Sequence, residues 1–154
     1  CQVFAQVYNL PCVSLRYFNV YGPRQDPNSQ YSAAIPKFIS RTLADKPAVI
    51  FGDGEQTRDF TFVNDVVKAN IMAVQSDVCG VFNVSCGISI TVNELIGVIT
   101  ELTGKKLIPI HKEERLGDVR NSLADVSKAK FFGFETKYAL EDGLRETVEW
   151  FSCR

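Results

Sequence analysis

The sequence lacks most of the features that would place it in a special class of protein. It has no apolar run near the ~20 residues that a membrane-spanning helix needs, and its first residues lack the basic, apolar and small-residue regions of a signal peptide. Its formal net charge of −1 gives no general attraction to nucleic acid, and its basic residues do not cluster on one predicted helix. We therefore expect a cytoplasmic chain that binds neither membranes nor nucleic acid.

Patterns typical of metal sites and disulfide frameworks are missing as well. The five cysteines are scattered without a C-x-x-C pair, and His111 is the only histidine. This odd-numbered, dispersed set favours reduced structural thiols over zinc ligands, so we expect no metal. His111 lies in a strand-like segment, residues 109–112, where a structural role is more common than that of a catalytic base.

What is present indicates one globular domain with alternating helices and strands. The 154 residues are 45% hydrophobic and 23% charged, and a chain of this length buries roughly 70% of its unfolded surface. Residues 12–15 form an apolar run that is typical of an internal strand in a mainly parallel sheet. Periodicity and turn residues predict further strands over 48–51, 59–63, 80–84 and 107–110, helices over 3–8, 33–44, 65–75, 92–103, 125–132 and 140–151, and a surface loop over 25–32.

Capping residues mark the start of three of these helices. Asn64 or Asp65 is expected to cap the helix that runs to about residue 75, and Asp125 is expected to cap the short helix that runs to about residue 132. Thr91 and Glu94 have the spacing of a capping box, in which each side chain bonds the backbone amide of the other residue.

A short glycine motif follows the strand predicted at 48–51. Gly52, Gly54 and Thr57 have the spacing of a dinucleotide-binding loop, but that loop has a small third residue and leads into a helix. Here the third position is threonine and a β-branched strand follows. We therefore predict a hairpin turn, and no phosphate-binding glycine loop in this chain.

Two arginines and an aromatic loop are the candidate ligand-binding features. Arg58 and Arg115 come from separate loops, and two planar guanidinium groups can neutralise a diphosphate; the alternative is that each is an exposed or ion-paired side chain. Asp118 either accepts hydrogen bonds from ribose hydroxyls or pairs with Arg115. Residues 17–19, Tyr-Phe-Asn, either offer a ligand an aromatic surface and an amide or fill the core at a strand end.

Three longer runs carry a resemblance to a known family. They are LRYFNVYGPRQ at 15–25, FGDGEQTRDF-x-x-V-x-DV at 51–66 and R-x-GDV-x-x-S-x-AD at 115–125. In this order they resemble the extended short-chain dehydrogenase/reductase family, and among its members the NAD-dependent UDP-glucose and UDP-N-acetylglucosamine 4-epimerases. The resemblance covers nearly the whole chain. It implies an α/β fold, the C-terminal portion of an extended Rossmann-like fold, with late parallel strands and a small mixed α/β substrate-binding lobe.

The resemblance implies a role for each candidate residue. Tyr17 and Phe18 correspond to the segment beside the nicotinamide of NAD, and Asn19 to a contact with the diphosphate of the sugar nucleotide. Ser122 corresponds to a position that faces the sugar ring, where a small side chain admits a 2-acetamido group. Arg58 and Arg115 correspond to the diphosphate clamp, and Asp118 corresponds to the ribose contact. Lys37 and Phe51 correspond to the walls of the uracil site.

The family's catalytic residues are missing from this sequence. Family members carry a Gly-rich NAD loop and a Ser/Thr plus Tyr-x-x-x-Lys set in their first half, with the Tyr and Lys on the helix before the strand that corresponds to residues 13–15. This chain opens within that helix, after the Lys, and Tyr8 has no Lys four residues on. We therefore expect residues 1–154 to be the substrate-binding portion, without the N-terminal NAD-binding half, without catalytic residues, and without NAD binding by this chain alone.

The intact family implies a reaction and a set of partners. A tyrosinate takes the proton of the sugar 4-hydroxyl while hydride passes to NAD, and the 4-keto sugar turns before hydride returns. We expect the UDP-hexose- or UDP-N-acetylhexosamine-binding part of a 4-epimerase, inactive by itself. Part of a nucleotide-sugar dehydratase or decarboxylase, and a non-enzymatic sugar-nucleotide-binding or interaction module, stay open, as does dTDP in place of UDP. Besides the UDP-sugar, the expected partner is a second copy, through exposed apolar surface, or the missing N-terminal half.

Overall fold

Helices and strands alternate along the chain, as hydrophobic periodicity predicts. The computed structural model describes residues 1–29 and 34–153; the end of the loop expected at 25–32 and the first residue of the helix expected at 33–44 lie outside the described residues. The elements in chain order are α1 (Gln2–Tyr8), β1 (Val13–Tyr17), β2 (Val20–Tyr21), α2 (Ala34–Leu43), β3 (Val49–Phe51), β4 (Thr57–Asp59), β5 (Thr61–Phe62), α3 (Val63–Gln75), β6 (Gly80–Val84), β7 (Ser89–Thr91), α4 (Val92–Thr103), β8 (Ile110–Lys112), the 3-10 helix η1 (Ser127–Phe132) and α5 (Leu140–Ser152).

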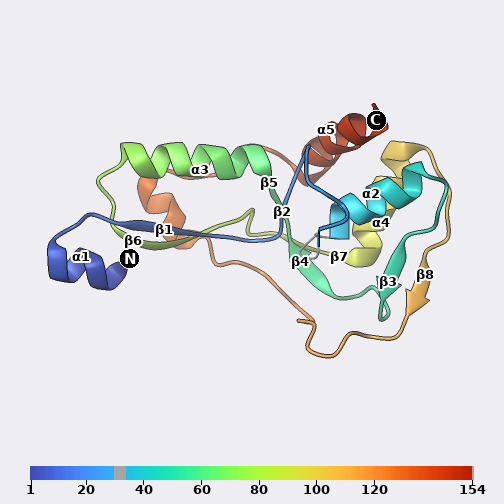
Figure 1. Cartoon of the computed structure of the whole chain (residues 1–154), viewed down its shortest axis with the longest axis horizontal. Helices are drawn as coiled ribbons and strands as arrows, with labels where there is room; N and C mark the ends of the chain where they lie inside the picture. The colour runs from blue at the N-terminus through green and yellow to red at the C-terminus, as the bar shows by residue number, and fades with distance from the viewer. Residues whose placement is uncertain (30–33, 154) are drawn as a thin grey trace.

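The longest strand pairing joins segments that are far apart in the chain. β1 runs parallel to β6, with Val13 opposite Gly80, and α3 lies along this pair (Figure 1). η1 packs on β6, and a small core that includes Ala69, Val84 and Ala129 lies among these elements. The parallel strands expected from the apolar runs are therefore present. Within the described residues β1 pairs on one side only, so the internal position expected for it is not observed.

A second group of elements forms a mixed lobe beside that pair. β3 pairs in parallel with β8, whereas β4 pairs antiparallel with β7. Helices α2, α4 and α5 pack on one another, and the larger core that they share with β3 and β5 contains Ile35, Ile39, Leu95 and Ile99, which are all fully buried (Figure 1). The short parallel pair of β2 and β5 connects this lobe to the β1–β6 pair.

Two predicted strand positions are wrong. The strand expected at 59–63 is split into β4 and β5, because its two halves pair with different strands, β7 and β2. The strand expected at 107–110 is shifted along the chain to β8. β4, β5 and β8 pair with β7, β2 and β3, none of which is adjacent in the chain. Hydrophobic runs alone therefore do not show where each strand begins and ends.

The turn after β3 is not the predicted hairpin. β3 and β4 do not pair with each other, although Gly52 and Gly54 do adopt the left-handed φ values of a tight turn, 86° and 82°. The Asp53 carboxylate closes the turn by accepting a hydrogen bond from the amide of Glu55, at 2.9 Å. The segment therefore redirects the chain from one strand pair to another.

The capping box at the start of α4 is confirmed. Thr91 Oγ1 accepts a hydrogen bond from the amide of Glu94 at 3.1 Å, and Glu94 Oε2 accepts one from the amide of Thr91 at 2.7 Å. The Thr91 amide also holds the pKa of Glu94 below its usual value. This cap fixes the end of α4 that faces the turn after β3.

The other two predicted caps are wrong. Phe62, not Asn64 or Asp65, precedes the first turn of α3, and no side chain caps it. Val126 occupies the cap position of η1, although Asp125 does accept a hydrogen bond from the first amide of that helix. Among the described residues, no helix is long and apolar enough to cross a membrane.

Candidate functional site

A cleft of about 720 Å³ lies in the mixed lobe and is bordered by α2, β3, β4 and the loop that follows β8. Six of the predicted site residues line it: Asn19, Lys37, Phe51, Arg58, Arg115 and Asp118. They come from five separate segments of the chain, which only the fold brings together. The lining also includes apolar side chains such as Val49 and Phe60, so the cleft combines cations with surfaces suited to a ring.

Arg58 is held rigidly on β4. Its Nη2 forms an ion pair with Asp118 Oδ1 at 2.5 Å, and its Nη1 donates to the backbone oxygen of Thr57 at 2.8 Å. Only 16% of the Arg58 side chain is exposed, whereas 38% of the Asp118 side chain is. Asp118 therefore pairs with Arg58 and not with Arg115, the pairing considered from the sequence. The guanidinium is positioned before any ligand arrives.

Arg115 approaches the same cleft from a different loop. Its guanidinium carbon lies 3.7 Å from the centre of the Phe51 ring, the geometry of a cation–π contact. Phe51 ends β3, so the loop after β8 and the strand paired with β8 present these two side chains together. The two arginines thus border one cleft, Arg58 from β4 and Arg115 from the loop after β8, an arrangement that can bind two anionic groups.

Asn19 and Lys37 complete the polar lining. Asn19 has a left-handed φ of 36°, and its Nδ2 donates to the backbone oxygen of Asp59 at 2.8 Å. Its side chain is therefore tied to β4, beside Arg58. Lys37 lies on α2 with an exposed side chain, so it adds a third positive charge to the cleft.

Three predicted site residues lie elsewhere. Tyr17 is 47% exposed, and its hydroxyl donates to Asn70 Oδ1 on α3 at 2.9 Å. Phe18 is half-buried at the end of β1, where its amide bonds the backbone oxygen of Val84. The Ser122 amide bonds the backbone oxygen of Thr57, but its side chain does not line the cleft. The roles that the resemblance implies for these three residues stay predictions.

Asp59 holds in place the strand that carries Arg58, and the sequence pattern did not identify it. Asp59 is fully buried beside Arg58, and its carboxylate accepts hydrogen bonds from the amides of Cys86, Gly87 and Ala124, at 3.2, 3.0 and 3.2 Å. It fastens β4 to two other segments. Burial and the charge of Asp59 raise the pKa of the Cys86 thiol to about 11. An acidic residue inside a strand was the available signal.

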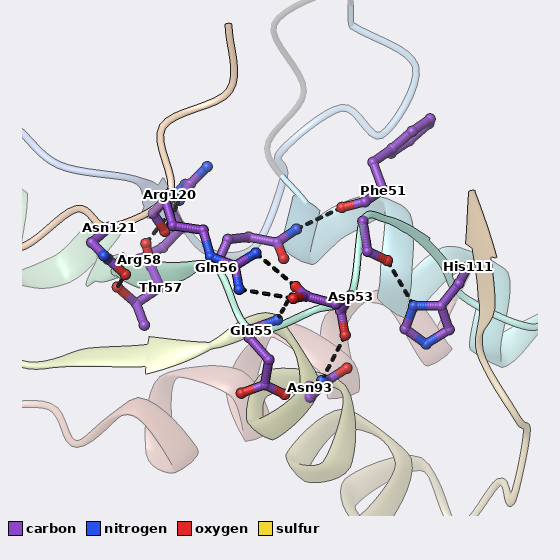
Figure 2. A network of polar contacts seen from close by, with 11 residues as sticks. Phe51, Asp53, Glu55, Gln56, Thr57, Arg58, Asn93, His111, Arg120 and Asn121 are labelled. Atoms are coloured by element: carbon purple, nitrogen blue, oxygen red, sulfur yellow. Dashed lines mark hydrogen bonds and ion pairs between the residues drawn. The ribbon is translucent and has the colours of Figure 1, made fainter. Parts of the chain in front are cut away.

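Gln56 is a second lining residue that sequence reasoning missed. Its Nε2 donates to the backbone oxygen of Phe51 at 2.9 Å, as Figure 2 shows. Its Oε1 is buried and has no hydrogen-bond partner among the described residues. A buried acceptor without a donor is costly, so Gln56 offers the cleft an acceptor for a ligand donor.

His111 and the cysteines do not line the cleft. His111 Nδ1 lies 2.8 Å from the backbone oxygen of Gly52, which joins β8 to the turn after β3 (Figure 2). The five cysteines are unpaired. Within residues 1–29 and 34–153, no cluster of three or more His, Cys, Asp or Glu side chains could hold a metal ion.

The fold is that of an α/β protein, and its cleft is lined by more basic than acidic side chains. A model of the NAD dependent epimerase/dehydratase family matches residues 1–85, which is more than half of the chain. The chain therefore belongs to the NAD-dependent epimerase/dehydratase family. The family resemblance of the three sequence runs and the Rossmann-like α/β fold that it implies are both confirmed.

Several relatives are similar over almost the whole chain. The UDP-N-acetylglucosamine 4-epimerase from Methanobrevibacter ruminantium M1, solved in complex with UDP-N-acetylmuramic acid, has a TM-score of 0.94 at 47% identity and covers 97% of this chain and 49% of its own. A putative UDP-glucose 4-epimerase from Methanocaldococcus jannaschii is 36% identical over 97% of this chain and 48% of its own length. A UDP-N-acetyl-alpha-D-glucosaminuronate decarboxylase from Bacillus cytotoxicus is 36% identical over 92% and 46%. The chain thus spans about half the length of these relatives.

Proposed function

We propose that the cleft binds a UDP-sugar and that residues 1–154 form the substrate-binding portion of an NAD-dependent 4-epimerase. The observation that carries this proposal is the placement of Arg58 and Arg115 on one cleft, from separate strands and loops. Two guanidinium groups suit a diphosphate, because each can bind two phosphate oxygens. The relative solved with UDP-N-acetylmuramic acid supports the choice of a UDP-sugar.

The remaining lining residues have roles that follow from their chemistry. Phe51 and the apolar wall beside it provide a surface for the uracil ring, and Lys37 lies at the same wall. Asp118 accepts hydrogen bonds from ribose hydroxyls when a ligand takes its place beside Arg58. Asn19 contributes an amide near the diphosphate. Ser122 is proposed, from the family resemblance, to face the sugar ring, where its small side chain would favour a 2-acetamido sugar.

The glycine turn after β3 does not have the form of a dinucleotide-binding loop. The Gly52–Gly54 turn leads into β4 instead of a helix, and the Asn93 side chain fills the space beside Gly54, with its Cγ 2.6 Å from the position of an added Cβ. Tyr17 is bonded to Asn70. NAD, which supplies hydride transfer in the family, is therefore proposed not to bind to this chain alone.

Catalysis is proposed to need residues that this sequence does not contain. No tyrosine in it is followed four positions later by a lysine, the pair in which a lysine lowers the pKa of a proton-accepting tyrosine. The purified chain with NAD is expected to leave UDP-glucose and UDP-N-acetylglucosamine unchanged. Epimerisation above that of a mock preparation from the same host would overturn this part of the proposal.

A decarboxylase is the second candidate, since one of the similar relatives is a UDP-N-acetyl-alpha-D-glucosaminuronate decarboxylase. Its substrate carries an additional sugar carboxylate, whereas a 4-epimerase substrate of the hexose type is neutral at that position. A chain that binds UDP-glucuronic acid at least about tenfold more tightly than UDP-glucose, a difference of about 1.4 kcal/mol, has a site for a sugar carboxylate. That result favours the decarboxylase or a UDP-glucuronate 4-epimerase, which is also among the relatives, over the hexose epimerase. Equal affinities favour the hexose epimerase.

Calorimetric titration of UDP-N-acetylglucosamine, with NAD as a separate titrant, tests the proposed ligand. We expect saturable binding of the UDP-sugar and none of NAD. Arg58→Ala is expected to weaken the UDP-sugar by more than about tenfold, or about 1.4 kcal/mol. Arg145→Ala is the matched control, because Arg145 pairs with Glu141 on α5 and does not line the cleft.

The opposite results separate the alternatives. Binding of the UDP-sugar that Arg58→Ala leaves unchanged would show that the cleft is not the site. No binding of either ligand by the folded wild-type chain would contradict the proposal and leave the interaction module as the better account of this chain.

A further inference from the structure

We propose that the ion pair between Asp53 and Arg120 is a clasp that positions Arg115 and Asp118 for the ligand. This inference rests on the proposed function and names two positioning residues for it. Neither Asp53 nor Arg120 lines the cleft. Both act through the loop at residues 113–119, which carries the second arginine and the aspartate of the site.

The clasp has the geometry of a strong ion pair. Arg120 Nη1 lies 2.7 Å from Asp53 Oδ1, and Arg120 Nη2 lies 2.8 Å from Asp53 Oδ2 (Figure 2). Two parallel hydrogen bonds fix the relative orientation of two planar groups, which a single contact does not. The bonds from Arg120 hold the pKa of Asp53 at about 2, so both partners are charged throughout the neutral range.

The Asp53 side of the clasp is fixed to the mixed lobe. The Asp53 carboxylate closes its own turn through the amide of Glu55, and its backbone oxygen accepts a hydrogen bond from Asn93 Nδ2 at 3.1 Å. Asn93 also donates its backbone amide to the oxygen of Gly54, at 3.1 Å. Because Asn93 belongs to the capped first turn of α4, the turn is tied to a buried helix.

The Arg120 side is joined to β4, next to Arg58. The backbone oxygen of Arg120 accepts hydrogen bonds from the Thr57 amide at 2.9 Å and, at 3.5 Å, from Arg58 Nη1. Thr57 Oγ1 donates to Asn121 Oδ1 at 3.2 Å (Figure 2). The backbone oxygen of Thr57 accepts from the Ser122 amide at 3.1 Å. Residues 120–122 are thus the downstream anchor of the loop.

The loop between its two anchors is exposed. β8 is the upstream anchor, where the Gly52 amide donates to the backbone oxygen of Lys112 at 2.9 Å. Every residue from 113 to 119 is exposed, and Arg115 and Asp118 hold the loop to the cleft through Phe51 and Arg58. The clasp fastens Arg120 by its side chain to the turn after β3, in addition to its backbone bond to β4. It therefore restrains the end of the loop, which lowers the entropy cost of ordering the loop on a ligand.

This role gives a signature that a general stabilising contact does not have. The side chains of Arg120 and Asp53 are 48% and 55% exposed, and exposed pairs contribute little to folding because water and salt screen them. Breaking the clasp is therefore expected to weaken ligand binding and loosen the loop while the melting temperature stays within about 2 °C. A structural contact would lower the melting temperature as well.

The experiment uses Asp53→Asn, Arg120→Met and the control Arg145→Met, which removes an exposed ion pair on α5. One measurement follows trypsin cleavage after Arg115 in the ligand-free chain by mass spectrometry. The other is calorimetric titration with UDP. Both clasp variants are expected to be cleaved after Arg115 about three- to tenfold faster and to bind UDP about three- to tenfold more weakly than the wild type, while the control matches the wild type.

A mutant cycle shows whether Arg120 acts through the loop, by comparing the effect of Arg120→Met on UDP affinity in the wild type and in a chain with an altered loop. If it does, Arg120→Met costs little further affinity once Arg115→Ala and Asp118→Asn are present, because the loop has no contact left to position. Full additivity would argue against the clasp.

The two measurements distinguish a failure of the proposed function from a failure of the clasp. A wild-type chain that does not bind UDP contradicts the proposed function, and the rate of cleavage after Arg115 still decides whether the clasp holds the loop. A wild-type chain that binds UDP, with clasp variants that match it in affinity and in cleavage, overturns the positioning role alone.

Discussion

Arg58 and Asp59 are adjacent on β4 but have different roles in the site. Arg58 faces the cleft, whereas Asp59 is fully buried and accepts three backbone amides. Successive side chains of a strand point to opposite faces, which explains why neighbours in sequence have such different surroundings. The sequence indicated Arg58 because a guanidinium binds phosphate, whereas the signal for Asp59 was only an acidic residue inside a strand.

Asp59→Ala is expected to destabilise the chain strongly. The substitution leaves three amides without their charged acceptor, which costs about 3 kcal/mol or more in the free energy of unfolding. Urea denaturation followed by circular dichroism measures this loss. Asp77→Ala is the control, because Asp77 is exposed and surface substitutions change the free energy of unfolding by about 0.5 kcal/mol or less. Equal midpoints for the two variants would contradict the role assigned to Asp59.

Cys86 is expected to react more slowly with iodoacetamide than Cys79 does. Burial and the charge of Asp59 raise its pKa to about 11, and its Sγ lies 3.1 Å from the backbone oxygen of Phe60, which accepts the thiol proton. A raised pKa leaves little thiolate at pH 8, so alkylation by iodoacetamide is expected to be about tenfold or more slower than at the exposed Cys79. Peptide mass spectrometry gives both rates. Equal rates in the folded chain, with equal rates in urea, would be inconsistent with this environment.

At the scale of elements, the helices were easier to predict than the strands. The periodicity of α4 and its capping box are local, so residues 91–104 contain all the information needed. The strand expected at 59–63 and the hairpin expected at 52–55 failed because strand pairing is set by distant partners, β7, β2 and β8. A local pattern cannot specify which remote segment a strand joins.

The same limit applies to the site. The cleft collects predicted residues from separate segments, but Tyr17, Phe18 and Ser122 lie outside its lining. Their predicted roles came from family resemblance, whereas the roles of Gln56 and Asp59 depend on burial and on partners that only the fold supplies. The residue types in the sequence predicted the positive charge of the cleft, but the packing of the fold determines which residues line it.

Two helix glycines are expected to respond to alanine in opposite directions. A Cβ on Gly143 of α5 would lie 2.8 Å from a ring carbon of Phe62 and still closer to the Tyr21 hydroxyl, whereas nothing lies within 4 Å of a Cβ on Gly97 of α4. Gly143→Ala is expected to lower the free energy of unfolding by about 1–3 kcal/mol through overpacking. Gly97→Ala is expected to raise it by about 0.5–1 kcal/mol, because alanine favours a helix. Changes of the same sign in urea denaturation would contradict the packing of α5.

At the scale of the whole molecule, apolar surface is exposed at one end. Helix α1 has no buried residue, and its apolar side chains are 56% to 68% exposed: Val3, Phe4, Val7 and Tyr8. The outward face of α3 exposes Val67, Ile71 and Val74. Large exposed apolar patches are unusual on monomers and are typical of surfaces that contact a partner.

We therefore expect the purified chain to self-associate. Sedimentation velocity at rising concentration should show a weight-average coefficient above that of a monomer, because association removes apolar side chains from water. Phe4→Ser with Val7→Ser is expected to reduce the association, whereas Gln2→Ser, an exposed polar change on the same helix, should leave it unchanged. A monodisperse wild-type monomer at the highest concentration would contradict the expectation.

A crystal structure of the chain with UDP would show whether one diphosphate contacts both arginines. We expect the diphosphate in the cleft, with oxygens about 3 Å from the guanidinium groups of Arg58 and of Arg115, and the uracil ring against the wall that contains Phe51. UDP bound outside the cleft, or in it with the diphosphate out of reach of either arginine, would contradict the proposed diphosphate site.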